Sequence, residues 1–435
     1  MGGRARYRVP GAKLPEYVHP RYPAPGTTNH RARASSATRH WGPGRVPPTN
    51  SVTALQCRAS SDYHFLARGP LPLTAPPRSM ISQSSHAFLK RLLDTPGPSG
   101  FETAPARVWR EEARSFAEVR GDVAGNSMAT VNADGGGPTI MLAGHIDEIG
   151  VIVNYVDDDG YVYIGPIGGW DPQVLVAQRL RIMGRHGDVF GVVGKKPIHL
   201  MKAPDREKAS QITDLWVDIG AASKAEAMER ISVGDAGVID SRTMEFPNGR
   251  LVSRSIDDRI GAFIVLEALR RYAERPGRAK VVAVATTQEE IAWKGGGALV
   301  GACGVDPKMA LVVDVTFATD HPGVEKKELG EHRLGGGPVL ARGSIISPIV
   351  FEMLRSTCES EKIPYSVHAV GRDTSTDADA IHIAREGVAT GLISLPNRYM
   401  HSPNEMVSVD DVDRAATLIA EVCRTVDEKV DFTAR

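Results

Sequence analysis

The chain has 435 residues, enough for two domains or for one large domain with an insertion. Apolar residues make up 42%, as in ordinary folded proteins, and no uninterrupted apolar run is long enough to span a bilayer. The formal net charge of zero hides two unlike parts: residues 1–80 carry +10 and the remainder −10. The acidic body has no basic surface with interleaved aromatic residues, so we expect neither a nucleic-acid nor a membrane partner.

The first part of the chain contains eleven arginines and Lys13 against only Glu16 and Asp62. It is rich in Pro, Gly and Ser and shows no sustained periodicity, which predicts a disordered basic extension over residues 1–79. Three interpretations are open. The simplest is an upstream translation start before Met80, the second is an Arg-rich organelle transit peptide, and the third is a tail that binds nucleic acid or another partner.

The four cysteines, Cys57, Cys303, Cys358 and Cys423, form no Cys-x-x-Cys pair. This spacing argues against a disulfide framework and against a thiolate zinc site. We therefore expect a reducing compartment. The cytoplasm fits best, or an organelle if the extension is a transit peptide.

The body begins with a predicted helix, "SSHAFLKRLLDT" at 84–95, followed by an apolar strand, "TIML" at 139–142. The pattern then changes to alternating runs with turn signals, such as Asp159-Gly160 and the pair of runs in "RLRIMGRHGDVFGVVG" at 179–194. Residues 153–245 are therefore predicted to form a small all-β insertion.

Helices and strands alternate again after the insertion. Helices are predicted over 257–275, 347–363, 377–387 and 409–430, and strands over 279–286, 309–316 and 388–396. This alternation predicts an α/β fold with a layered sheet. The simplest architecture is one catalytic domain, built from residues 80–152 and 246–435, that the β insertion interrupts.

Polar side chains follow the apolar strands of this predicted sheet. They are His145, Asp147, Asp257, Asp258, Glu289, Glu290, Asp314 and His401. Open α/β sheets bind ligands beyond the carboxyl ends of their strands, so strands that share an edge would bring these groups into one crevice. Two imidazoles and several carboxylates suit a divalent transition metal such as zinc.

The number of carboxylates exceeds what one metal ion needs, which favours two ions with a bridging aspartate. Neighbouring residues of an extended chain point in different directions, so Glu289 and Glu290 can have separate tasks, one as a ligand and one as a proton acceptor. Each residue alone has a simpler interpretation: Asp257 and Asp258 as a helix N-cap, for example, or His401 in a surface loop. A charge within an apolar strand, as at Asp314, is rarely left unpaired.

Five motifs, "AGHIDEIG", "DDRIG", "TTQEEIAWKGG", "VVDVT" and "NRYMHSPNE", occur in the order that is typical of the tetrahedral (TET) aminopeptidases. The chain resembles this family of di-metal peptidases, which includes glutamyl aminopeptidases and proteins often labelled endoglucanases. The resemblance covers about residues 84–430. It implies a layered α/β/α peptidase domain and a PDZ-like insertion that mediates self-association into a dimer or a dodecamer.

The resemblance also implies a role for each matching residue. It makes His145 and Asp314 ligands of one ion and Glu290 and His401 ligands of the other, with Asp257 as the bridge. It makes Glu289 the general base, Asp147 the carboxylate that orients His145, and Asp258 an outer neighbour of the ligands. Two divalent ions, zinc or cobalt, would then serve hydrolysis of short peptides with a free N-terminus.

Two other functions compete with a metal-dependent aminopeptidase. A related di-metal deacylase or carboxypeptidase would use the same ligands, but it would not require a free amine on its substrate. A non-catalytic assembly protein would have lost its metal ligands, whereas here the ligand set is intact. A glycosidase, as a further variant of the related hydrolase, is a weak alternative. It would need two carboxylates flanking a sugar and no histidine ligands.

Overall fold

The computed structural model describes residues 81–291 and 296–433, so the predicted basic extension lies outside the described residues. In the described part, the helices are α1 (Gln83–Asp94), α2 (Thr103–Ala113), α3 (Pro172–Leu175), α4 (Ala203–Arg206), α5 (Lys224–Arg230), α6 (Ile256–Glu274), α7 (Gly296–Val305), α8 (Lys326–Leu329), α9 (Pro348–Ser360), α10 (Ala378–Ile381) and α11 (Val409–Thr425). None of these helices is both long and apolar enough to cross a membrane.

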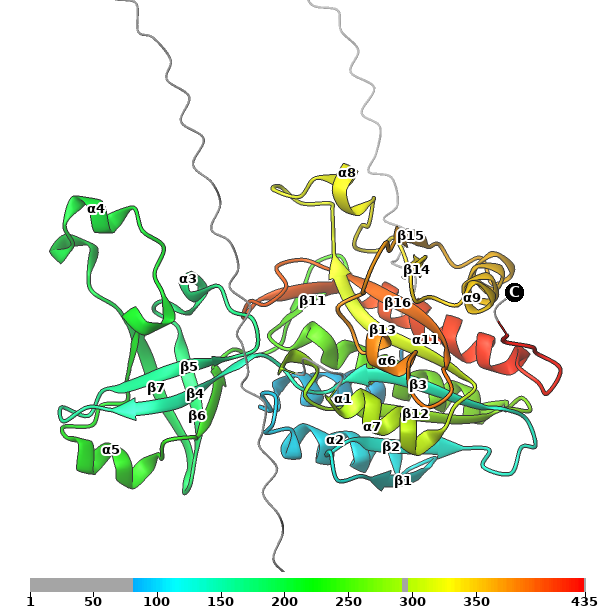
Figure 1. Cartoon of the computed structure of the whole chain (residues 1–435). Helices are drawn as coiled ribbons and strands as arrows, with labels where there is room; N and C mark the ends of the chain where they lie inside the picture. Colours follow the sequence, from blue (N-terminus) through cyan, green and yellow to red (C-terminus); the bar gives the residue numbers. More distant parts are fainter. Residues whose placement is uncertain (1–80, 292–295, 434–435) are drawn as a thin grey trace, which may run out of the picture. The chain divides into compact units, whose positions relative to one another are not determined.

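The largest sheet of the described residues has eight strands in the order β1-β2-β12-β3-β13-β16-β14-β15 (Figure 1). Its strands are β1 (Glu118–Gly121), β2 (Ser127–Val131), β3 (Thr139–His145), β12 (Lys280–Thr286), β13 (Met309–Phe317), β14 (Val339–Arg342), β15 (Ser366–Ala369) and β16 (Ala389–Asn397). The central strands β12, β3, β13 and β16 are parallel. Their carboxyl ends therefore lie at one edge of the sheet.

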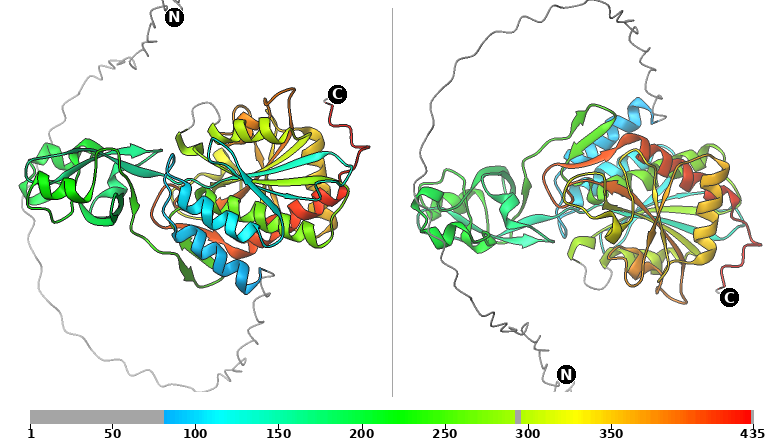
Figure 2. Two further views of the ribbon diagram at one scale, coloured as in Figure 1. Left: turned by 90° about the horizontal axis from the view of Figure 1, so that it is seen from below. Right: turned by 90° about the horizontal axis from the view of Figure 1, so that it is seen from above.

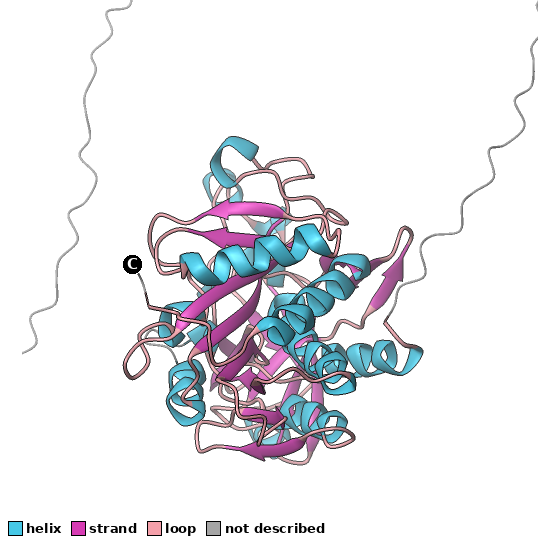
Figure 3. Cartoon of the chain, turned by 90° about the vertical axis from the view of Figure 1, so that its right-hand side faces the viewer, coloured by secondary structure: helices cyan, strands magenta, loops and turns pink. Residues whose placement is uncertain are grey.

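Helices cover both faces of this sheet (Figure 2). α6 packs on β3, β12 and β13 with α1 and α11 beside it, whereas α7 and α10 contact β12 and β16 from the other face. Figure 3 shows helices crossing one face of the strands. This arrangement confirms the predicted α/β layers.

The helix α6 is buried on nearly all sides, as expected of a helix that is apolar around its circumference. Phe263 and Leu266 have no exposed surface, and each such side chain contributes about 1.5–3 kcal/mol when fully buried. The buried Trp109 of α2 donates a hydrogen bond from Nε1 to the Ala262 carbonyl oxygen at 2.9 Å. The position of α6 is thus fixed by packing, which matters because its first turn carries Asp257 and Asp258.

The middle of the chain forms a closed barrel among the described residues, with strands in the order β4-β5-β8-β7-β6-β9. They are β4 (Gly150–Val156), β5 (Val162–Ile167), β6 (Arg179–Gly184), β7 (Gly187–Gly194), β8 (Trp216–Asp218) and β9 (Ala236–Ile239). The barrel strands thus run from Gly150 to Ile239, whereas the expected limits of the insertion were 153–245. The short helices α3, α4 and α5 lie in the connections between these strands. The likeness to a PDZ domain and the exact limits of the insertion stay predictions.

A small antiparallel sheet, β10-β11-β17, joins β10 (Met244–Phe246) and β11 (Arg250–Ser253) to β17 (Glu405–Ser408).

Two predicted helices are shorter than expected. The helix expected over 377–387 is only α10, because the chain turns back through Gly387 at φ 98° and Val388 donates to the His382 carbonyl oxygen. The closing helix ends at Thr425 instead of 430, where Val426 adopts an extended conformation.

Candidate metal centre

The parallel strands deliver their polar residues to the same edge of the sheet. His145 is the last residue of β3, Glu289 and Glu290 follow β12, and Asp314 lies near the end of β13. His401 follows β16, the neighbour of β13. The predicted convergence of these residues is confirmed as geometry, whereas the role of each residue stays a prediction.

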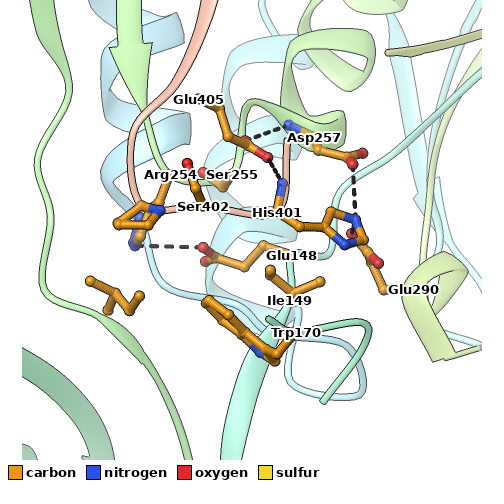
Figure 4. Close-up of a pocket in the computed structure, with 12 residues that line it drawn as sticks. Glu148, Ile149, Trp170, Arg254, Ser255, Asp257, Glu290, His401, Ser402 and Glu405 are labelled. Atoms are coloured by element: carbon orange, nitrogen blue, oxygen red, sulfur yellow. Dashed lines mark hydrogen bonds and ion pairs between the residues drawn. The ribbon is translucent and has the colours of Figure 1, made fainter. Parts of the chain in front are cut away.

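Asp257 lies between the two histidines. Its Oδ1 is 3.2 Å from His145 Nε2. Its Oδ2 is 3.2 Å from His401 Nε2 (Figure 4). His401 Nε2 is also 3.3 Å from Glu290 Oε1. One carboxylate therefore presents a different oxygen to each imidazole, as a bridging group would.

The His401 ring is oriented by the backbone of residue 169. Its Nδ1 lies 2.8 Å from the Gly169 carbonyl oxygen, which can only accept a hydrogen bond. Nδ1 therefore carries the hydrogen and leaves Nε2 to face Asp257 and Glu290. Burial alone would lower the pKa of His401, but these two carboxylates raise it to about 11.

Asp147 is fully buried and lies beside His145, with 3.5 Å between its Oδ1 and His145 Nδ1. Its second oxygen accepts a hydrogen bond from Ser99 Oγ at 2.5 Å. Burial alone would raise the pKa of Asp147, but the contact with His145 lowers it. The carboxylate predicted to orient His145 is thus ionised and faces the ring nitrogen that points away from Asp257.

Asp258 differs from its neighbour Asp257 in its partners. Its carboxylate accepts hydrogen bonds from the His145 and Gly261 backbone N–H groups, each at 3.2 Å, and it is fully buried. Ligand atoms of Asp258 and Asp314 also lie within 4.8 Å of one another and of His145. Asp258, expected as an outer neighbour, is thus among the groups that can reach a cation held by His145.

The carboxylates of this site repel one another. Burial raises the pKa of Glu289, and the charges of Asp314, Asp377 and Glu290 add to this effect. His145 opposes them, and the pKa is raised to about 10 in all. Burial likewise raises the pKa of Asp314 well above its usual value. So many buried carboxylates are compatible with a folded protein only if they take up protons or bind cations.

The residues present fit divalent cations. The groups His145–Asp257–Glu290 and His145–Asp258–Asp314 each bring ligand atoms within 4.8 Å of one another. Two ligand atoms at 2.0–2.2 Å from one tetrahedral ion are roughly 3.3–3.6 Å apart. Asp257 Oδ1 lies at a similar distance, 3.2 Å, from His145 Nε2, and Glu290 Oε1 lies 3.3 Å from His401 Nε2. Among the described residues, the buried Oε1 of Glu290 accepts no hydrogen bond and instead has the 3.3 Å contact with His401 Nε2, so a cation could take up its lone pairs.

Two carboxylates of the site had no predicted role. Glu405 is 2% exposed and accepts hydrogen bonds from the backbone N–H groups of Asp257 at 3.0 Å and His401 at 2.8 Å (Figure 4). Asp377 is buried and accepts a hydrogen bond from Thr286 Oγ1, and burial raises its pKa to about 6. Glu405 lies within the "HSPNE" segment of a motif already noted, but its sequence position alone does not indicate its partners.

A layered α/β sheet with two histidines and several buried carboxylates at its carboxyl edge defines the class of metal-dependent hydrolases. Residues 125–418 match the M42 glutamyl aminopeptidase family. A relative from Pyrococcus furiosus (strain ATCC 43587 / DSM 3638 / JCM 8422 / Vc1), a lysyl aminopeptidase, is 35% identical over 353 residues, which are 80% of this chain and 98% of the relative.

Two solved structures are similar in fold as well as in sequence. The TET aminopeptidase of the marine sediment archaeon Thaumarchaeota archaeon SCGC AB-539-E09 has a TM-score of 0.75 and 34% identity, covering 79% of this chain and 97% of that one. The Pyrococcus horikoshii TET1 peptidase, which can assemble into a tetrahedron or a large octahedral shell, has a TM-score of 0.70 and 28% identity, covering 79% and 100%.

The chain therefore belongs to the M42 glutamyl aminopeptidase family, and it is a metal-dependent aminopeptidase. The resemblance found in the five motifs is confirmed. The deacylase and carboxypeptidase alternatives are not favoured.

Proposed function

We propose that this chain removes N-terminal residues from short peptides with two divalent cations, zinc or cobalt. His145 and Asp314 would hold one cation, Glu290 and His401 the other, and Asp257 both. The observation that carries this proposal is the pair of 3.2 Å contacts from the two Asp257 oxygens to two different histidines. When bound, the cations would lower the pKa of water and polarise the peptide carbonyl.

The protein's own residues supply the proton transfers. We assign the general base to Glu289, whose Oε2 lies 3.8 Å from His145 Nε2 and whose side chain is 19% exposed. With the cations bound, their charge would keep Glu289 ionised. Its carboxylate would then take a proton from the attacking water and return it to the leaving amine. Carboxylates left without a cation would hold the α-ammonium of the substrate, so we expect cleavage to require a free N-terminus.

The test uses a panel of aminoacyl-p-nitroanilides with the full chain, first with EDTA and then with zinc, cobalt or manganese restored. N-acetylated substrates serve as controls, and their cleavage would contradict exopeptidase action. Glu289→Gln should lower kcat about 10²–10⁴-fold and retain the metal. Glu290→Gln is the contrasting variant and should lose metal. Loss of metal from Glu289→Gln would make Glu289 a ligand and refute its assignment as base.

We also propose that the barrel of β4–β9 mediates self-association into a dimer or a dodecamer. Supporting this, the strand β7 presents two apolar side chains to solvent, Phe190 at 56% and Val192 at 49% exposure. The Pyrococcus horikoshii TET1 peptidase can assemble into a tetrahedron or a large octahedral shell. Size-exclusion chromatography with light scattering of Phe190→Asp tests the proposal, because an unchanged assembly size would contradict a role for this face.

The cytoplasm is our proposed location for the enzyme. The cysteines of the described residues, Cys303, Cys358 and Cys423, are free thiols, as is usual in a reducing compartment. Fractionation of cells that express the full chain tests this location. Recovery in an organelle would instead favour the transit-peptide interpretation of residues 1–79.

A further inference from the structure

The turn after β12, Thr287–Glu290, carries the two glutamates of the site, and we call it the glutamate turn. Its backbone N–H groups find their acceptors in side chains from distant parts of the chain. Asp147 accepts from Glu289 and Glu290, each at 3.2 Å. The N–H groups of Thr287 and Gln288 bind two further side chains, Asn126 and Glu102, that have no assigned role.

Glu102 precedes α2 and is 7% exposed. Its Oε1 accepts hydrogen bonds from the backbone N–H of Gly100 at 2.7 Å and of Gln288 at 3.1 Å. Gln288 has φ 63°, a left-handed conformation that is strained for a residue other than glycine. Such a conformation persists only when its surroundings enforce it, and the hydrogen bond to Glu102 is part of that enforcement.

Asn126 is fully buried and joins the two chain segments on either side of the glutamates. Its Oδ1 accepts from the Thr287 N–H at 3.1 Å, and its Nδ2 donates to the Gly297 carbonyl oxygen at 2.8 Å. Gly297 in turn donates its N–H to the Thr287 carbonyl oxygen at 2.9 Å. A Cβ at Gly297 would lie 2.3 Å from Asn126 Oδ1, so the close approach requires glycine at this position.

We propose that Glu102 and Asn126 are positioning residues that hold the glutamate turn in the conformation that presents the general base and a metal ligand. Neither residue needs to touch substrate or cation. Each fixes a backbone N–H within two residues of Glu289, and a carboxylate on so short a tether moves with its backbone. The inference rests on the proposed function for its kinetic consequence, but its structural consequence can be measured without metal or substrate.

Amide hydrogen exchange of the metal-free full chain measures the structural consequence. Glu102→Ala removes the acceptor of the Gln288 N–H, so exchange should accelerate at Thr287–Glu290. Glu102→Gln keeps an acceptor oxygen of the same reach and should restore wild-type protection. Asn126→Asp keeps the acceptor for Thr287 but places an oxygen against the Gly297 carbonyl, so it should also loosen the turn.

The matched control is Asp411→Ala. Asp411 is another fully buried carboxylate that accepts two backbone N–H groups, from Gly335 at 2.6 Å and Gly337 at 2.8 Å, away from the glutamates. Its loss should destabilise the protein and expose the amides near Gly335, while protection of the glutamate turn stays at the wild-type level. Thermal unfolding of every variant shows which part of an effect is global.

Kinetics with saturating metal complete the test. Glu102→Ala and Asn126→Asp should lower kcat about 10–100-fold and leave KM unchanged, and Glu102→Gln should recover kcat. Wild-type exchange at the glutamate turn in both Glu102→Ala and Asn126→Asp would overturn the proposal, as would a loss of kcat that Glu102→Gln does not restore. Faster exchange together with wild-type kcat would refute the catalytic role of the turn and so count against the proposed function.

Discussion

Replacing Gly144 by alanine tests how closely the position of His145 depends on α6. Gly144 precedes His145 in β3, and a Cβ there would lie 2.5 Å from the Gly261 carbonyl carbon and 2.7 Å from the Ala262 nitrogen. Both are backbone atoms of α6, which cannot rotate away as a side chain can. Contacts below 3.4 Å are rare for Cβ atoms, so β3 and α6 would have to separate by about 0.9 Å, the difference between 3.4 and 2.5 Å.

This separation acts directly on the site. His145 lies on β3, and Asp257 lies in the first turn of α6, with 3.2 Å between Nε2 and Oδ1. A displacement near 1 Å costs about 10²-fold in rate when it misplaces reacting groups. Overpacking of a core costs about 1–3 kcal/mol, which is less than the total stability of most domains, so Gly144→Ala should stay folded.

The assay is kcat/KM for an aminoacyl-p-nitroanilide with saturating metal, combined with thermal unfolding of the same samples. Gly304→Ala is the control, because Gly304 lies in α7 with no heavy atom within 4 Å of a new Cβ. It should leave activity unchanged and gain up to about 1 kcal/mol from helix propensity. Wild-type kcat/KM and an unchanged midpoint in Gly144→Ala would refute the argument that β3 and α6 set the geometry of the site.

Three further predictions concern the ligands and their charges. Asp257→Asn should lower the bound metal, measured by mass spectrometry, more than Asp258→Asn, and the reverse order would move the bridge to Asp258. Glu405→Gln leaves a backbone N–H of Asp257 or His401 without an acceptor, so it should cost about 1–3 kcal/mol in urea unfolding; an unchanged midpoint would mean that the two hydrogen bonds contribute little. Metal-free protein should lose stability as the pH rises from about 5 to 9, because burial raises the pKa of Glu289 to about 10 and the folded state then binds more protons than the unfolded state. Stability that rises over this range would contradict the prediction, and the metal-loaded protein is the control.

Much of the site could be predicted because its residues follow apolar runs that are visible in the local sequence. The apolar runs that became β3, β12, β13 and β16 are continuous and buried, as parallel strands are, so their carboxyl ends had to share an edge. His145 and Asp314 stand at the ends of two such runs, where a polar residue needs a partner. Short strands such as β1 and β14 were not predicted, because four residues are too few to show a clear period.

The sequence by itself thus determined the layered fold, the edge of the sheet where the site lies, and the residue types that gather there. Only the tertiary structure decided how that site is held. Glu405 binds the N–H of Asp257 across 148 residues, and Glu102 binds the N–H of Gln288 across 186. The tertiary structure also showed that the two oxygens of Asp257 face separate histidines, whereas the Asp258 carboxylate accepts hydrogen bonds from backbone N–H groups. Hydrogen bonds between distant segments leave no periodicity in either segment, so they become visible only when packing brings the segments together.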